Sequence, residues 1–192
     1  MRFYMRNLLA ASLPLVVLGA RKRDVSSSAT FQLYAYGDGF GGLPLYYVDG
    51  LAYIGDPSVA NSSEAAVVIF SMDSNHHFIG NPNVTDGDVA PSWSNVTLFV
   101  PEPSSGDKRV GFLPPNDGTG NTTTHTSGFA FYGSTAMLHG DDGSISTAFS
   151  SIKSQKTGMY ELFWNDTEGA IPLTLRRTAP SNRPSNLTSE AR

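Results

Sequence analysis

The chain has 192 residues, of which 17 are acidic, 13 are Lys or Arg and none is Cys. The formal net charge of −4 argues against binding to a nucleic-acid backbone or to an anionic membrane surface. The lack of cysteine excludes disulfide bonds, thiol catalysis and cysteine metal sites, so stability has to come from an apolar core and from backbone hydrogen bonds.

The first predicted element is a signal peptide over residues 1–20. The basic segment "MRFYMR" precedes the apolar run "NLLAASLPLVVLGA", which is shorter than the roughly 20 residues of a membrane span. Lys22 and Arg23 form a dibasic pair that resembles a processing site of the fungal secretory pathway, so residues 21–23 are predicted to be a short pro-segment. Cleavage after Arg23 removes five of the 13 basic residues and leaves 8 against 17 acidic ones, a net charge of −9.

Residues 24–177 are predicted to form one all-β domain, either an antiparallel β-sandwich or a closed β-barrel. Short runs of β-branched and aromatic residues recur between clusters of Gly, Pro, Asn and Asp. Asp49 and Gly50 are the two-residue signature of a tight hairpin. Eleven strands are expected, at residues 30–36, 44–48, 51–55, 65–71, 95–100, 110–113, 128–133, 135–139, 147–152, 159–165 and 171–177.

The segments between these strands are predicted to be turns and loops. "YGDGFGG" at residues 36–42 contains G-x-G-x-x-G, but β-favouring residues follow it instead of a helix, so it is interpreted as a glycine-rich strand connection and not as a nucleotide site. "HGDDGS" has the composition of a turn. Residues 101–127 contain a long connection rich in Pro, Gly, Asn and Thr, and residues 178–192 are predicted to be a disordered tail.

Six N-x-Ser/Thr sequons agree with secretion and predict N-glycosylation at surface positions. Their asparagines are Asn61, Asn83, Asn95, Asn121, Asn165 and Asn186.

Three stretches carry a resemblance to a family. "LYAYGDGFGGLPLYYVDGLAYIGD", "GFAFYGSTAMLHGDDG" and "GMYELFWNDTEGAIPLTLRRTAPSN" resemble small secreted proteins of filamentous ascomycete fungi that have no assigned activity. The likeness covers most of the mature chain. It implies fungal secretion and no particular chemistry.

The candidate catalytic residue is Glu161. Strand alternation would place it on one face with Met159 and Phe163, where apolar neighbours could raise its pKa, and a glycoside hydrolase would need it paired with a second carboxylate. A surface glutamate explains the same pattern. No G-x-S-x-G serine elbow occurs in the sequence.

Candidate metal ligands are His76, His77, His139 and Asp141. Adjacent histidines point to opposite faces of a strand, so His76 and His77 could share an ion only from a loop, and a solvated turn explains "DSNHHFIG" equally well. No metal or other cofactor is expected.

The candidate ligand-binding residues are aromatic. Trp93, in the loop-like "APSWSN", is expected near the surface, and alternation sends one of Tyr46 and Tyr47 inward and the other outward. We therefore expect a non-catalytic extracellular or cell-wall protein, with a cell-wall polysaccharide or a surface protein as partner and with neither nucleic acid nor membrane. A secreted glycoside hydrolase and a protein-binding effector are the alternatives, and the oligomeric state stays open.

Overall fold

The computed structural model describes residues 29–85, 89–115, 123–140, 142–166 and 168–181. In these ranges the chain is nearly all β, with one short 3-10 helix, η1 (Pro57–Ala60). No helix in the described ranges has the length and apolar character needed to cross a membrane. The predicted signal peptide and the dibasic pair Lys22 and Arg23 lie outside the described residues.

Fourteen strands make up the sheet in the described part of the chain. Their bounds are β1 (Tyr34–Gly37), β2 (Phe40–Val48), β3 (Leu51–Gly55), β4 (Ala66–Met72), β5 (Phe78–Pro82), β6 (Val96–Pro101), β7 (Gly111–Leu113), β8 (Thr124–His125), β9 (Phe129–Tyr132), β10 (Thr135–His139), β11 (Ile145–Ser146), β12 (Phe149–Lys153), β13 (Met159–Trp164) and β14 (Ile171–Arg176). Each of the eleven expected strands overlaps one of them.

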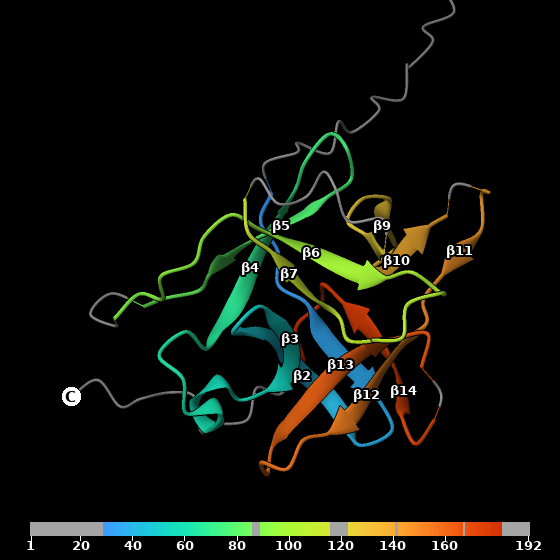
Figure 1. The fold of residues 1–192 in the computed structure, drawn as a ribbon. Coiled ribbons are helices and arrows are strands. Elements are labelled where there is room, and N and C mark those ends of the chain that lie inside the picture. Colours follow the sequence, from blue (N-terminus) through green and yellow to red (C-terminus); the bar gives the residue numbers. More distant parts are fainter. Residues whose placement is uncertain (1–28, 86–88, 116–122, 141, 167, 182–192) are drawn as a thin grey trace, which may run out of the picture.

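Ten of the strands close into an antiparallel barrel. Of the two architectures predicted from the sequence, a β-sandwich and a closed β-barrel, the structure confirms the barrel. The order is β1-β2-β4-β5-β6-β7-β3-β13-β12-β14, and β14 pairs back with β1. Because β2 also pairs with β3, this hairpin joins two parts of the barrel: β4 to β7 on one side, and β1 with β12 to β14 on the other (Figure 1). Strands β9, β10 and β11 extend the sheet beyond β14.

Two tight turns start the barrel. Asp49 and Gly50 link β2 to β3 with φ angles of 48° and 88°, and this confirms the predicted hairpin. Asp38 and Gly39 link β1 to β2, so the glycine-rich stretch is a strand connection, as expected. Glycine and aspartate suit these turns because both tolerate a positive φ better than branched residues do.

Alternation along β2 separates two apolar clusters. Leu45 and Tyr47 pack into the main barrel core, whereas Tyr46 and Val48 face a second, outer cluster. Helix η1 contributes Ala60 to this outer cluster and covers it. On β13 the predicted alternation also holds, because Tyr160, Leu162 and Trp164 all pack on the main core.

Three strands were not expected from the sequence. β5 contains Gly80, Asn81 and Pro82, residues that disfavour strands, but it is paired with β4 on one side and β6 on the other. β8 and β11 are two residues long and exist only through pairing with β6 and β10. β8 lies within the predicted long connection, of which residues 116–122 are outside the described ranges.

The chain continues past β14 along the barrel wall. Residues 178–181, the beginning of the predicted disordered tail, lie against β1 and β2: the Tyr36 hydroxyl donates to the carbonyl of Thr178, and a side chain at Gly42 would collide with Pro180. Residues 182–192 lie outside the described residues.

Candidate functional site

A pocket of about 570 Å³ opens along β14, where β1 and β12 flank that strand. We call it the β14 pocket. It is lined by Tyr36, Gly37, Thr147, Ala148, Phe149, Ser150, Asn165, Asp166, Pro172, Leu173, Thr174 and Arg176. Its volume falls in the range of roughly 300–1,000 Å³ that is usual for small-molecule sites.

The floor of the β14 pocket is apolar and rigid. Phe149 and Leu173 are buried members of the barrel core, and the Phe149 ring packs edge-on against Trp164 with ring centroids 4.7 Å apart. Ala148 adds a further apolar contact surface. Because these side chains belong to the core, their positions are fixed before any ligand arrives.

One side of the pocket carries polar groups on the turn after β13. Asn165 has a φ of 55°, and its backbone N–H donates to the carbonyl of Ala148 at 2.8 Å. The Ser150 hydroxyl donates to the carbonyl of Asp166 at 2.8 Å, and the Glu168 N–H donates to Asp166 Oδ1 at 3.1 Å. These bonds fix the turn while the second carboxylate oxygen of Asp166 remains able to accept a ligand hydroxyl.

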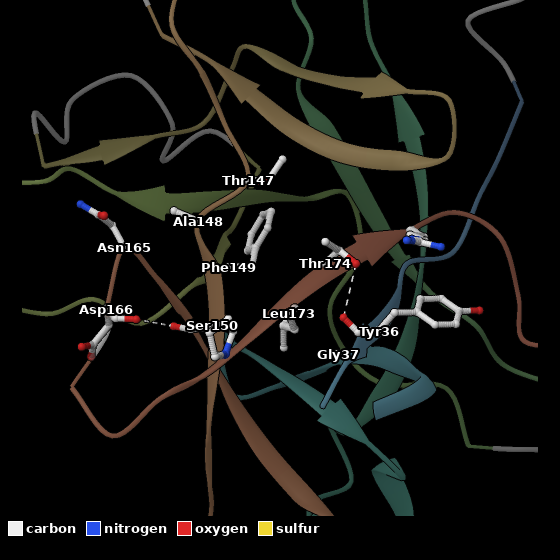
Figure 2. A pocket seen from close by; sticks show the side chains of 12 residues that line it. Tyr36, Gly37, Thr147, Ala148, Phe149, Ser150, Asn165, Asp166, Leu173 and Thr174 are labelled. Carbon is white, nitrogen blue, oxygen red and sulfur yellow. Dashed lines mark hydrogen bonds between the residues drawn. The ribbon is translucent and has the colours of Figure 1, made fainter. Parts of the chain in front are cut away.

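The opposite side is formed by Tyr36 and Arg176. Figure 2 shows Asn165 and Asp166 at one side of the pocket and Tyr36 at the other, with Phe149 and Leu173 between them. The Tyr36 hydroxyl donates to the Thr178 carbonyl at 2.9 Å, and the Thr174 hydroxyl donates to the Tyr36 carbonyl at 3.3 Å. The guanidinium carbon of Arg176 lies 5.3 Å from the centroid of the Tyr36 ring, within cation–π range.

The aromatic residues predicted to bind a ligand are placed differently from expectation. The expectation that Trp93 lies near the surface is wrong: its side chain is only 8% exposed and belongs to the main core. The reason is Glu64, whose carbonyl accepts from Trp93 Nε1 at 2.8 Å and whose carboxylate accepts from the N–H and hydroxyl of Ser92. This anchor folds the loop down onto the barrel.

Trp93 and Tyr47 nevertheless come together. Their rings stack with centroids 4.3 Å apart, and a pocket of about 450 Å³ lies beside them. Tyr46 faces the other side of the sheet, as alternation requires, but it is fully buried in the outer cluster instead of exposed. The predicted alternation of this pair therefore holds, with Tyr47 half-buried on the core side, but the outward-facing Tyr46 is covered by the outer cluster and offers no exposed ring.

Glu161 lies on the outside of the barrel in a charged group. Its Oε2 is 3.6 Å from Nε of Arg109, which also donates to the Tyr53 hydroxyl at 3.0 Å. Burial raises the pKa of Tyr53, although the neighbouring Arg109 opposes the shift. Among the described contacts of Glu161 there is a cation and no second carboxylate, so the geometry does not supply the pair that glycoside hydrolysis uses.

The histidines do not converge. His77 Nδ1 lies 2.7 Å from Asp73 Oδ2, whereas His76 and His139 are exposed. Within the described ranges no three His, Asp or Glu side chains are grouped as a metal site, and Asp141 lies outside these ranges. Partial burial alone would raise the pKa of Asp73, but hydrogen bonds from the His77 ring and from backbone N–H groups outweigh it and lower that pKa.

Four of the six sequon asparagines fall within the described residues, and all four are exposed: Asn61, Asn83, Asn95 and Asn165. Asn121 and Asn186 lie outside them. Comparison with protein-family models, curated proteins and solved structures found no match.

Sequence reasoning missed most of the β14 pocket. Of its lining residues, only Asn165 had been singled out, and that as a glycosylation site. The available signal was the pair Arg176-Arg177 at the end of an apolar strand in an otherwise acidic chain.

Proposed function

We propose that the protein is a secreted, N-glycosylated, non-catalytic module that binds glycans in the β14 pocket. The observation that carries the proposal is the composition of this pocket, an apolar floor between two polar sides. Sugar rings offer apolar faces and hydroxyl edges at the same time, so a site for them combines apolar contact with hydrogen-bonding side chains.

The polar groups support binding more than hydrolysis. Among the described residues that line the pocket, Asp166 is the only carboxylate, whereas glycosidases hold a sugar between two. Asp166 offers an acceptor for ligand hydroxyls, and Arg176 offers donors at the other side. Secretion is supported by the predicted signal peptide and by the exposed positions of the described sequons.

The test is a binding screen of the secreted mature protein against chitin, β-glucan, mannan and cellulose, with released sugars assayed in the same wells. Asp166→Asn should weaken binding by about three- to tenfold, because a neutral amide accepts weaker hydrogen bonds than a carboxylate. Asp56→Asn is the matched control, since Asp56 also accepts a backbone hydrogen bond, from Ser58, but lies outside the pocket.

Each outcome bears on the proposal. Binding that falls with Asp166→Asn and not with Asp56→Asn supports it. If Asp166→Asn leaves the affinity unchanged, the glycan binds outside the β14 pocket. Release of sugars would indicate an enzyme. If none of the glycans binds, the proposed function is wrong.

A further inference from the structure

Arg176 has hydrogen-bond donors that no described residue uses. Its side chain is exposed, and within the described ranges its guanidinium makes neither a hydrogen bond nor an ion pair; its contact is the Tyr36 ring. By contrast, Arg109 is paired with Glu161, and Arg177 donates to the carbonyl of Gly133.

The Tyr36 ring orients the guanidinium of Arg176 without occupying its N–H donors. Tyr36 is fixed from both ends, because its hydroxyl donates to Thr178 and its carbonyl accepts from Thr174. A guanidinium over an aromatic ring interacts through its face, while its N–H groups lie in its own plane and stay free for a ligand. Arg176 is therefore partly oriented before binding, at little further cost in side-chain entropy.

The position of Arg176 is also specific. Arg176 and Tyr36 line the β14 pocket and, in addition, an adjoining pocket of about 470 Å³ that continues over Gly41, Ser134 and residues 178–181. Arg176 is thus one of the two residues that both pockets share. A chain of sugar units that runs through both pockets would pass directly over it.

We infer that the glycan is a linear, uronic-acid-containing chain, with the carboxylate of one sugar unit bound by Arg176. This inference rests on the proposed function. The planar fork of a guanidinium matches a carboxylate in a bidentate arrangement. A singly charged carboxylate also suits a pocket whose far side holds Asp166, since the more highly charged phosphate monoester would be repelled more strongly there. The hydroxyls of the same chain would then face Asp166.

The experiment compares each acidic oligosaccharide with its own methyl ester, which keeps the sugar and removes the charge. The probes are oligogalacturonate and glucuronate-bearing xylan oligomers, titrated into the mature protein by calorimetry at fixed salt. We expect at least one acid to bind about tenfold more tightly than its ester, as a charge-assisted bidentate contact allows. Arg176→Gln should remove this preference, and Arg176→Lys should keep only part of it.

Arg177→Gln is the matched control. It removes the same charge at the neighbouring position, so it changes the long-range field equally, but Arg177 lines neither of the two pockets. The ratio of the affinities for the acid and for its methyl ester should be the same in Arg177→Gln as in the wild type. An equal loss in Arg176→Gln and Arg177→Gln would mean that general electrostatics causes the preference, and would overturn the inference.

The remaining outcomes separate this inference from the proposed function. If acids and esters bind equally, or if only neutral glycans bind, the uronate inference is wrong and glycan binding stands. If no glycan of any kind binds, both are wrong.

Discussion

Tyr46→Phe should stabilise the protein. Tyr46 is fully buried, and its hydroxyl has no hydrogen-bond partner among the described residues. A buried polar group without a partner costs about 1–3 kcal/mol, which the phenylalanine variant recovers. Removing the oxygen leaves a void of roughly 10–15 Å³, which at about 24 cal/mol per Å³ costs only a few tenths of a kcal/mol. The net gain is about 1–2 kcal/mol.

The measurement is urea unfolding of the variant beside the wild type, together with a thermal scan. For a domain of this size the gain corresponds to a rise in Tm of roughly 2–8 °C. Tyr36→Phe is the control with the opposite sign, because the Tyr36 hydroxyl is bonded to Thr178 at 2.9 Å and its loss should cost up to about 1 kcal/mol. If Tyr46→Phe instead lowers stability by more than about 1 kcal/mol, the hydroxyl has a partner and the reasoning is refuted.

The same substitution has a signature at alkaline pH. Burial, with added effects of the Tyr53 and Asp56 charges, raises the pKa of Tyr46 well above its usual value. The folded protein therefore keeps this proton when the unfolded chain has lost it, so the free energy of unfolding should fall as the pH rises above about 10. Unfolding curves taken across that range should show a smaller fall for Tyr46→Phe than for the wild type. Equal pH dependence would contradict the raised pKa.

Three further changes test other parts of the structure. Trp93→Ala should lower the free energy of unfolding by roughly 3–5 kcal/mol in urea titrations, because it removes a core ring stacked on Tyr47; a loss under about 1 kcal/mol would mean that the ring is exposed. Ser151→Ala should leave stability unchanged or raise it by about 1 kcal/mol, since the buried Ser151 hydroxyl lacks a partner within the described ranges; a clear loss would reveal one. Because the pKa of Asp73 is lowered in the folded state, its contribution should be lost as the pH falls below about 4, and Asp73→Asn should flatten acid unfolding curves there.

The parts of the fold that the sequence predicted are those with local causes. The β2–β3 hairpin follows from Asp49-Gly50 between two β-favouring runs, and the two faces of β13 follow from alternation. β5 was missed because its residues Gly80, Asn81 and Pro82 oppose strand formation and only pairing with β4 and β6 imposes it. The position of Trp93 was missed for a similar reason, since Glu64 holds its loop from 29 positions away in the sequence.

The candidate site depends on contacts that are even more distant. Tyr36 and Thr174, which are 138 residues apart, meet in the β14 pocket because β1 and β14 close the barrel in a particular register. A slip of one residue would turn Tyr36 away from this face. Neither the closure of the barrel nor the register of β1 against β14 can be predicted from the sequences of these two strands alone. The sequence could therefore indicate aromatic and charged candidates, but it could not predict which of them lie together in one pocket.

The sequons have two separate explanations that the structure helps to distinguish. Asn61, Asn95 and Asn165 have φ angles of 55°, 52° and 55°, and asparagine is among the few residues that adopt this left-handed conformation easily. Turn geometry by itself therefore accounts for asparagine at these positions. It does not account for a Ser or Thr two positions later, except at Asn95, where Thr97 belongs to β6 and threonine is favoured in strands. The support for glycosylation thus comes from the hydroxyl residues of the sequons, and from Asn83, which is exposed and is not among the residues with a positive φ.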